Sequence, residues 1–364
     1  MKHLVCFHLF NDYSGSPKVL KMVLEGLLRK GEQIDLISSR GGVLDELLSY
    51  PNLHKHSYAY RFSNRAALTM LRYGAVQCLT FLWAFRWLFC RNTVFYINTI
   101  LPLGPALAGR LMGKRVVYHY HENAMIKGAF YRFLARCMQG LASEVICVSE
   151  YQRSFLSRIQ GVTVIPNAVP KAFAERLCPE LELAFLNRRV LMLGSLKGYK
   201  GTQEFIALAR KLKDFQFELV LNEETEAVSD FIRQHQVEDI RNLTVWARQQ
   251  DVTSFYHRAS VVLNLSDKHR FIETFGLTAL EAMSAGLPVI VPTVGGIAEM
   301  VTDGVNGYRM DVQELDRIAE TLEQLLHDKE RYIRLANGAY RRSQSFREDV
   351  MIENIYNILT SSNL

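Results

Sequence analysis

Short runs of β-branched and other apolar residues alternate with helical stretches along almost the whole chain, and this alternation constrains the fold more than any other feature. The first apolar run, at 4–10, is followed by a turn at 11–16 and a helical stretch at 18–30. Apolar strands separated by helices are typical of parallel sheets that are covered by helices. The sequence therefore predicts an α/β fold.

The predicted strands form two series. The first series continues with the runs at 33–38, 93–97, 115–119, 145–148 and 162–165. The second series has runs at 189–193, 217–221, 243–246, 260–265 and 288–291, with helices such as 203–213 and 277–285 between them. Between the two series lies the stretch 166–187, which holds three prolines and no clear strand.

A length of 364 residues suits two domains of ordinary size. We expect two Rossmann-like domains that face each other across a cleft, the first with its linker at 1–187 and the second at 188–364. Open parallel sheets bind ligands beyond the carboxyl ends of their strands, so the cleft is the expected active site. The final helix, near 348–359, is expected to pack back on the first domain.

The charge is divided unevenly between the two halves. Residues 1–187 carry 22 Lys and Arg against 12 Asp and Glu, a net charge of +10, whereas the remainder carries 21 against 25. Between Glu46 and Glu122 there is no acidic residue, while nine residues are basic. The first half therefore suits an anionic partner, although a solvated basic face explains the same composition.

Composition and spacing exclude several classes of protein. No run of about 18 uncharged apolar residues occurs, so no membrane span is expected, and no small-residue cleavage site follows the run at 4–10. The six cysteines are scattered without a CxxC pair or a zinc-like histidine spacing. We expect buried free thiols in a cytoplasmic protein.

The densest pattern of polar and glycine residues begins after the strand at 261–265. A polar loop leads into a helix near 277–285, and the free N–H groups and dipole at such a helix start favour a phosphate group. Gly276 lets the backbone approach that ligand closely. The candidate ligand-binding residues at this junction are Phe275, Gly276, Leu277 and Thr278.

Two glutamates flank this junction, eight residues apart. Glu273, at the tip of the loop, can accept hydrogen bonds from sugar hydroxyls. Glu281, two helical turns into the helix, can hold a ribose diol, as an acidic residue does in dinucleotide folds. Taken alone, two glutamates at this spacing are explained by solvated surface carboxylates.

Glycines and a proline follow the two glutamates at fixed positions, namely Gly286-x-Pro288-Val289, Gly295-Gly296-x-x-Glu299 and Gly304-x-Asn306-Gly307. The whole run resembles the C-terminal signature of the retaining glycosyltransferases of family 4, which have the GT-B fold. The resemblance covers about 4–359 and is strongest after 189. It implies that the second domain binds a nucleotide-sugar donor, that the first holds the acceptor, and that Glu273 orients the sugar.

The segment 191–201 resembles the first strand and phosphate loop of the same family's donor domain. Lys200 matches a lysine that reaches the donor diphosphate. Ser195 stands where many members have arginine, which leaves one cation fewer on the leaving group. The residues that can substitute for that arginine are Lys197, Arg248 and Arg270.

The first half matches the family in the same order along the chain. Gly15 and Ser16 lie where the family has a small-residue loop close to the donor phosphates and the acceptor. His121, directly before Glu122, takes the position of the family's active-site histidine. Because His119 and His121 share one face of a strand, an exchange of their roles stays open, as does a buried structural histidine.

The resemblance implies sugar transfer with retention of configuration to a glycan or lipid-linked sugar, and a role in surface polysaccharide synthesis. Lys200, the helix start after Gly276 and the backbone near Gly15 would neutralise the leaving diphosphate. Asp-x-Asp is absent from the sequence, so we expect no metal and no other cofactor besides the donor substrate. Closure of the two domains would complete the site. No nucleic-acid partner is expected.

Three other functions stay open. A sugar-nucleotide epimerase or phosphorylase of similar fold is the nearest. A nicotinamide oxidoreductase is disfavoured because no Gly-x-Gly-x-x-Gly follows the run at 4–10. A non-catalytic nucleotide-sugar-binding subunit is favoured only by Ser195 in place of arginine.

The acid-free stretch also suggests peripheral attachment to a membrane. Aromatic residues alternate with arginines there, and such a helix can lie in the interface with anionic headgroups. These residues are Phe81, Trp83, Phe85, Trp87 and Phe89, with Arg72, Arg86 and Arg91. The alternative is that the aromatic residues belong to the core of the domain.

Overall fold

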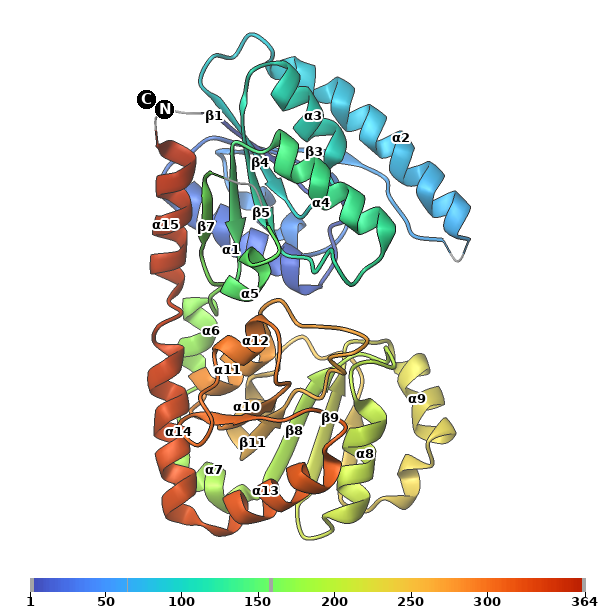
Figure 1. Cartoon of the computed structure of the whole chain (residues 1–364), viewed down its shortest axis with the longest axis vertical. Helices are drawn as coiled ribbons and strands as arrows, with labels where there is room; N and C mark the ends of the chain where they lie inside the picture. The colour runs from blue at the N-terminus through green and yellow to red at the C-terminus, as the bar shows by residue number, and fades with distance from the viewer. Residues whose placement is uncertain (1–2, 64, 157–159, 362–364) are drawn as a thin grey trace. The chain divides into compact units, whose positions relative to one another are not determined.

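A computed structural model describes residues 3–63, 65–156 and 160–361 of the chain. These residues form two compact units, Met1–Asn167 with Asp349–Leu364 and Ala168–Glu348. Within the described residues, each unit is built on one sheet whose strands all run parallel, with helices packed on it (Figure 1). The α/β fold predicted from the alternation of strands and helices is confirmed.

The first sheet has the strand order β3-β2-β1-β4-β5-β6-β7 in the described residues. Its strands are β1 His3–Phe7, β2 Ile34–Ser39, β3 Leu53–Tyr58, β4 Thr93–Asn98, β5 Arg115–Tyr120, β6 Glu144–Cys147 and β7 Val162–Val164. β1 lies centrally and pairs with both β2 and β4. The change of direction in strand order at β1 and β4 places the loops after these strands where parallel sheets bind ligands.

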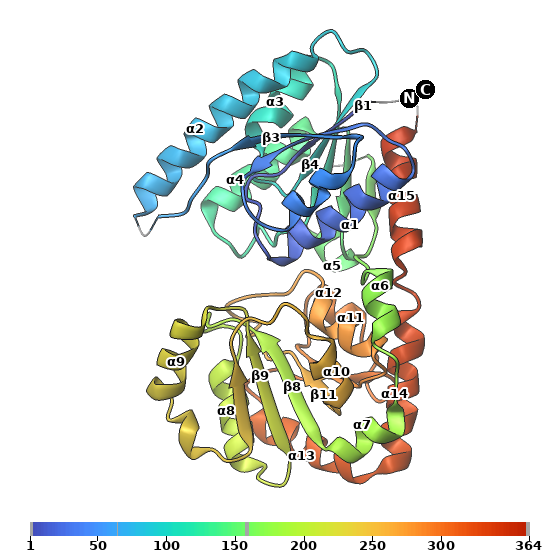
Figure 2. The same ribbon diagram turned by 180° about the vertical axis from the view of Figure 1, so that it is seen from behind.

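Helices cover both faces of this sheet. They are α1 Gly15–Arg29, α2 Ala66–Ala84, α3 Leu103–Leu111, α4 Ala129–Leu141, α5 Glu150–Arg153 and α15 Glu348–Thr360, with 3-10 turns at Val43–Ser49 and Phe85–Trp87. Val5 and Phe7 of β1 share a core with side chains of α2, α3 and α4. The alternate residue Leu4 lines a small cavity with residues of α1 and α15, which lie on the other face (Figure 2).

The second sheet has the strand order β10-β9-β8-β11-β12-β13 in the described residues. Its strands are β8 Arg189–Gly194, β9 Gln216–Leu221, β10 Leu243–Trp246, β11 Val261–Leu263, β12 Val289–Val291 and β13 Gly307–Arg309. The helices are α6 Lys171–Arg176, α7 Leu181–Asn187, α8 Thr202–Lys211, α9 Thr225–Gln234, α10 Thr253–Arg258, α11 Leu277–Ser284, α12 Gly296–Glu299, α13 Leu315–His327 and α14 Lys329–Ser343, with a 3-10 turn at Val237–Asp239. The central strands β8 and β11 carry the loops of the candidate site.

The division between the units lies at 167/168 rather than at the expected 187/188. Residues 168–187 form α6 and α7 and belong to the second unit. The ring centroid of Phe185 in α7 lies 5.4 Å from that of Tyr332 in α14, and Ser260 Oγ donates to the Ala184 carbonyl. These contacts come from residues far along the chain, so the proline-rich composition of the stretch could not reveal them.

The last helix contributes most of its residues to the first unit. Lys30 Nζ in α1 lies 2.7 Å from Glu353 Oε2 in α15. Arg115 at the start of β5 pairs with Glu144 and donates to the Ser361 carbonyl at 2.9 Å. The side chain of Ile352 fills the space beside Gly26, where a Cβ atom would lie 2.5 Å from its Cδ1.

Two of the strands in the described part of the chain have no counterpart among the predicted runs. β3 carries two histidines and a lysine because it is an edge strand with half its side chains near water. β13 has three residues, the first of which is glycine. Neither pattern resembles the apolar runs of the central strands.

The aromatic residues at 81–89 do not share one environment. Trp87 is 5% exposed and its Nε1 donates to Asp35 Oδ2 at 3.1 Å, so this residue belongs to the core. Phe81 and Trp83 are partly buried against the same core. Phe89 is 91% exposed. Trp87 therefore agrees with the alternative that these aromatic residues belong to the core, whereas Phe89 does not.

Candidate active site

The loop between β11 and α11 places a helix start beside the carboxyl end of a central strand. Gly276 adopts φ +92°, and a Cβ atom there would lie 2.5 Å from Ile297 Cγ1, so glycine is required by both conformation and space. The helix starts at Leu277, and Thr278 follows in the first turn; both are half-buried. Phe275 is buried against Phe346, with ring centroids 5.8 Å apart.

The diglycine loop supports the backbone of Glu273. Gly296 N donates to the Glu273 carbonyl at 2.9 Å. Gly295 has φ +103°, and a Cβ atom there would lie 2.4 Å from the same oxygen. The Gly295-Gly296 pair therefore has a local physical purpose, which is to let the β12–α12 loop approach the backbone of Glu273.

Lys200 and Glu273 are paired directly. Lys200 Nζ donates to Glu273 Oε1, and Ser266 Oγ donates to the same oxygen at 3.2 Å. Burial alone would raise the pKa of Glu273, but the charge of Lys200 and hydrogen bonds from Lys200, Ser266 and Asn264 hold this pKa below its usual value. Glu273 is therefore ionised near neutral pH and can accept hydrogen bonds from hydroxyl groups.

An aromatic pair supports the lysine. The rings of Tyr199 and Phe271 stack with centroids 4.7 Å apart, and Lys200 Nζ lies 4.4 Å from the Phe271 centroid. Asp267 N donates to the Tyr199 carbonyl at 2.8 Å. The loop after β8 and the loop after β11 are thus held together, which brings Lys200 and Glu273 to one place.

Glu281 faces a buried tyrosine. Tyr256 Oη donates to Glu281 Oε2 at 2.6 Å, and Tyr256 is fully buried in α10. This bond fixes the orientation of the carboxylate, and Glu281 is half-buried in the middle of α11. Tyr256 could not be identified from the sequence, because it lies 25 residues upstream of Glu281 in a short helix.

The three cations considered as substitutes for an arginine at position 195 lie in different surroundings. Arg248 donates to Asn222 Oδ1 at 2.8 Å and pairs with Glu224 at 2.6 Å. Arg270 Nη1 donates to the Gly198 carbonyl at 3.0 Å, within the loop that follows Ser195. Lys197 is exposed in that loop. Arg270 is therefore the guanidinium of this group that reaches the loop after β8, and it does so from the loop after β11.

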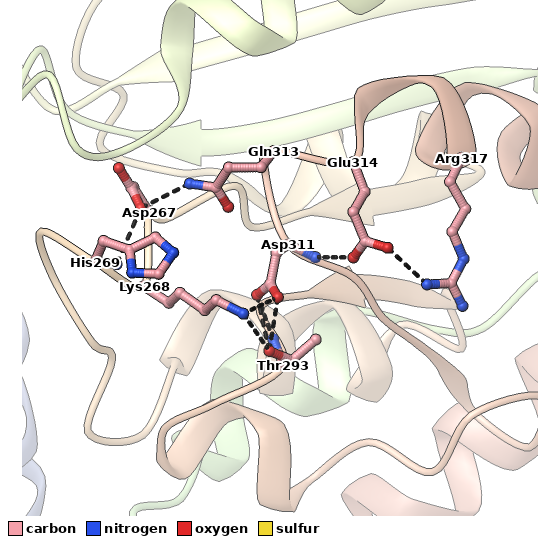
Figure 3. A network of polar contacts seen from close by, with 8 residues as sticks. All are labelled: Asp267, Lys268, His269, Thr293, Asp311, Gln313, Glu314 and Arg317. Atoms are coloured by element: carbon pink, nitrogen blue, oxygen red, sulfur yellow. Dashed lines mark hydrogen bonds and ion pairs between the residues drawn. The ribbon is translucent and has the colours of Figure 1, made fainter.

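A polar network holds the loop after β11 in place, as Figure 3 shows. Lys268 pairs with Asp311, and Thr293 Oγ1 donates to Asp311 Oδ1 at 2.9 Å. Gln313 Nε2 donates to Asp267 Oδ1 at 2.9 Å. Lys268 is therefore a structural cation that ties the loop after β11 to the ends of β12 and β13.

In the first unit, His121 belongs to a chain of hydrogen bonds. His121 Nε2 lies 3.0 Å from Asn98 Oδ1, and Asn98 Nδ2 lies 3.0 Å from His8 Nδ1. His8 Nε2 lies 2.8 Å from the Phe10 carbonyl, which can only accept. Each bond is satisfied when His8 carries its proton on Nε2 and His121 donates from Nε2.

His8 and His121 are both neutral near pH 7. Burial lowers the pKa of His8 to about 4. Burial, and then the neighbouring imidazoles of His119 and His8, hold the pKa of His121 well below its usual value. His121 can therefore act as a neutral hydrogen-bonding group after the end of β5.

The neighbours of His121 are more deeply buried. His119 is fully buried, and its Nδ1 lies 2.7 Å from Tyr96 Oη. Glu122 is 8% exposed and accepts the Ile100 N–H at 3.2 Å, and burial raises its pKa. His121 is half-buried. Of the three residues, His121 is therefore the most exposed, whereas His119 and Glu122 are buried.

The small-residue loop of the first unit lies at the start of α1, which begins at Gly15. Gly15 is exposed and Ser16 is half-buried. Ser14 N and Ser14 Oγ both donate to Asp12 Oδ1, at 3.0 and 2.6 Å. The loop is thus shaped by its own side chains, and the N–H groups of the first helical turn point along the helix axis.

The predicted residues therefore form two groups. Lys200, Glu273 and the junction 275–278 gather on tied loops of the second unit. Gly15, Ser16 and His121 lie on the first unit, at the starts and ends of its elements. In the described residues, no three His, Cys, Asp or Glu side chains are arranged to hold a metal ion.

Two family models match the chain, one in each half. The model described as Glycosyl transferases group 1 matches residues 186–342. The model described as Glycosyltransferase Family 4 matches residues 13–173. The chain belongs to the group 1 glycosyltransferases. The two matches follow the order of the two sheets and include both groups of candidate site residues.

Curated relatives match parts of this glycosyltransferase. A D-inositol 3-phosphate glycosyltransferase of Paenarthrobacter aurescens is 30% identical over 166 residues, which are 43% of this chain and 40% of that protein. An uncharacterized glycosyltransferase of Haemophilus influenzae is 27% identical over 200 residues, 53% of this chain and 55% of that protein. An N-acetyl-alpha-D-glucosaminyl L-malate synthase of Bacillus anthracis is 35% identical over 30% of this chain and 29% of that protein. The chain thus spans about a third to a half of the length of these relatives.

Solved structures resemble this glycosyltransferase over nearly its whole length. Anabaena Alr3699/HepE, in a complex with UDP and glucose, has a TM-score of 0.77 at 18% identity, with 100% of both chains covered. Sucrose-phosphate synthase from Thermosynechococcus elongatus has a TM-score of 0.76 at 17% identity, with 98% of both chains covered. At this identity the likeness concerns the fold, which is that of the GT-B glycosyltransferases. Of the helices in the described residues, none combines the length and apolar character needed to cross a membrane.

Proposed function

We propose that this glycosyltransferase transfers a sugar from a nucleotide-diphosphate sugar to a glycan or lipid-linked sugar, with retention of configuration. The observation that carries the proposal is the Lys200–Glu273 pair beside the Gly276 helix start. A cation, a carboxylate and a row of backbone N–H groups at one place suit a diphosphate linked to a sugar. The structural relative from Anabaena was solved with UDP-glucose, so UDP is the first donor base to test.

Each residue has a proposed role. Lys200 and the N–H groups of Leu277 and Thr278 stabilise the charge that develops on the leaving diphosphate. Glu273 accepts hydrogen bonds from the sugar, and Glu281, oriented by Tyr256, accepts them from the ribose. Gly15 and Ser16 contribute backbone N–H groups, and neutral His121 bonds to the sugar or to the acceptor. Fixed cations serve the diphosphate in place of a metal ion.

A donor screen tests this proposal directly. Thermal shift with UDP, GDP, ADP and their sugars identifies the base, and release of the free nucleotide then measures turnover. Proton NMR of the first sugar anomer released by slow hydrolysis reports retention, because an α-linked donor should give the α anomer first. Binding without any nucleotide release would favour a non-catalytic subunit. Release that requires orthophosphate would favour a phosphorylase.

The surface of the first unit suggests that the acceptor lies at an anionic membrane. Exposed apolar side chains occur on α2 and just beyond it, at Leu71, Leu82 and Phe89, which are 70%, 66% and 91% exposed. Arg86 and Arg91 are exposed in the same segment. Apolar groups with nearby cations suit an interface with anionic headgroups, and each cation adds about 1 kcal/mol of attraction.

Vesicle sedimentation tests the membrane proposal. The protein should sediment with vesicles that contain phosphatidylglycerol at low salt and be released at high salt, because salt shortens the Debye length. Vesicles of phosphatidylcholine alone should not bind it, and Leu82→Ser with Phe89→Ser should weaken sedimentation. Failure to bind anionic vesicles at low salt would favour a soluble anionic acceptor, the class to which the names of two curated relatives refer, inositol 3-phosphate and L-malate.

A further inference from the structure

A polar cavity lies at the edge of the second sheet, apart from the residues of the donor site. It has a volume of about 600 Å³ and opens beside the edge strand β13. Its polar lining comes from β13, the turn before it, and helices α13 and α14. These residues are Asp303, Tyr308, Arg309, Arg317, Arg331 and Arg334.

The positive charge of this cavity is only half compensated. Arg309 pairs with Asp303 at 2.9 Å, and Arg317 pairs with Glu314 at 2.8 Å. Arg331 donates to neutral oxygens, Tyr308 Oη at 2.7 Å and Gln324 Oε1 at 3.0 Å. The side chain of Arg334, one helical turn further along α14, has no hydrogen bond or ion pair with any residue that the structure describes. Two guanidinium charges therefore face the cavity without a counter-charge.

Like charges gathered in one place raise the free energy of the folded protein unless a bound anion offsets their repulsion. Four guanidinium groups around one cavity repel one another, whereas a polyanion would satisfy them at once. The planar fork of N–H donors in arginine matches the oxygens of a phosphate group. A cavity of this volume has room for a small metabolite with more than one phosphate.

We propose that this arginine cavity binds a small phosphorylated metabolite with at least two negative charges. Arg331 and Arg334 bind the phosphate groups. The Cζ atom of Arg331 lies 5.5 Å from the centroid of the Tyr308 ring. Arg309 and Arg317 add to the positive field. The site is separate from the donor loops, since neither Lys200 nor any residue from 273 to 281 lines it.

The cavity is connected to the donor loop by the network in Figure 3. Glu314 accepts from Arg317 through one oxygen and from Asp311 N, at 3.2 Å, through the other. Asp311 in turn holds Lys268 and Thr293. An anion that draws Arg317 away from Glu314 loosens the support of Asp311, and hence the loop that bears Glu273. Occupation of the cavity should therefore change the mobility of this loop.

Calorimetry with inorganic pyrophosphate tests the site. Because pyrophosphate can also occupy the donor site, the comparison is made in Lys200→Ala protein at about 150 mM salt, where exposed charges are screened. Adding Arg331→Gln and Arg334→Gln should weaken pyrophosphate binding by roughly tenfold or more, since charge-assisted hydrogen bonds are lost. Arg334→Gln alone, which breaks no side-chain hydrogen bond or ion pair within the described residues, should weaken binding severalfold. Arg341→Gln, an exposed arginine of the same helix outside the cavity, should leave it unchanged.

Amide hydrogen exchange of the same proteins tests the connection. Pyrophosphate should increase exchange in 267–273 and 311–314 of Lys200→Ala protein, and should have no such effect once Arg331 and Arg334 are replaced. Equal pyrophosphate affinity with and without these two arginines would overturn the site. Unchanged exchange in both segments on saturation would overturn the connection to the donor loop. Neither readout depends on the sugar donor or on turnover, so a failure here is distinct from a failure of the proposed function.

Discussion

Lys200 donates a charge-assisted hydrogen bond to the carboxylate of Glu273, although the two residues are 73 positions apart in the sequence. Lys200 lies in the loop after β8, and Glu273 lies in the loop after β11. Because these parallel strands are neighbours in the sheet, the two loops leave it side by side, and the two side chains can meet. In the proposed function, Lys200 binds the donor diphosphate and Glu273 binds the sugar.

Removal of the Glu273 carboxylate should abolish most of the transfer activity. Glu273→Gln removes an acceptor that forms charge-assisted hydrogen bonds, which are worth about 1.5–3 kcal/mol, so kcat/KM should fall roughly 10- to 150-fold. Glu226→Gln, an exposed residue of α9, is the matched control and should retain full activity. Wild-type kcat/KM in Glu273→Gln would contradict the proposed contact with the sugar.

Replacement of Tyr256 by Phe should separate the orientation of Glu281 from its presence. The variant loses the 2.6 Å hydrogen bond but keeps the ring in the core, so the free energy of unfolding should fall by about 1 kcal/mol and nucleotide affinity by severalfold. Glu281→Ala should lose more affinity. It should also lose about 1–3 kcal/mol of stability, because the buried Tyr256 hydroxyl is left unpaired.

Urea unfolding and calorimetric titration with UDP measure both effects. If Tyr256→Phe binds nucleotide as tightly as the wild type, the hydroxyl does not position Glu281 for the ligand.

Arg270 should supply the cation that position 195 lacks. Its guanidinium reaches the loop 195–201 through Gly198, whereas Arg248 is held by Asn222 and Glu224. Arg270→Ala should lower kcat by roughly tenfold or more, because a charge on the leaving diphosphate is lost in the transition state. Arg248→Ala should change kcat less than twofold. A larger loss for Arg248→Ala than for Arg270→Ala would reverse this assignment.

Chelation should leave the rate of transfer nearly unchanged. Lys200, Arg270 and the start of α11 provide the positive charge that a divalent cation would otherwise bring. Initial rates are compared in excess EDTA and after addition of Mn²⁺ or Mg²⁺. An activity that EDTA abolishes and Mn²⁺ restores would show that fixed cations do not suffice.

Acid should destabilise the first unit through His8. The pKa of His8 falls from 6.5 to about 4 on burial, so between these values the unfolded state binds more protons than the folded state. The contribution of neutral His8 to the free energy of unfolding is complete above pH 6.5. As the pH falls to about 4 this contribution is lost, which lowers the free energy of unfolding by about 3 kcal/mol.

Urea unfolding at a series of pH values measures this slope in the wild type and in His8→Asn. The slope should be shallower in His8→Asn, because the titrating group is absent. His257→Asn, at an exposed position of α10, is the control and should keep the wild-type slope. Identical slopes in all three proteins would mean that His8 is not buried as a neutral imidazole.

The sequence alone was sufficient for the α/β fold and for most strands of the two sheets. Apolar strands such as 217–221 are recognisable because they are buried on both faces, and this burial restricts each position to similar residue types. Gly276 and Gly295 stand out because their backbone conformations and close neighbours exclude a side chain. Edge strands such as β3 escaped detection because half of their side chains face water.

Only the tertiary structure decided which side chains meet. The pairs Lys200–Glu273 and Tyr256–Glu281, and the contact of Asn98 with both His8 and His121, join residues from different strands and helices. Local sequence determines whether a strand or a helix forms, because nearby side chains restrict the backbone conformation of each residue. The partner of a polar group is determined by strand order and packing, which depend on the whole chain. The arginine cavity has the same origin, since β13, α13 and α14 bring its four guanidinium groups together only in the folded unit.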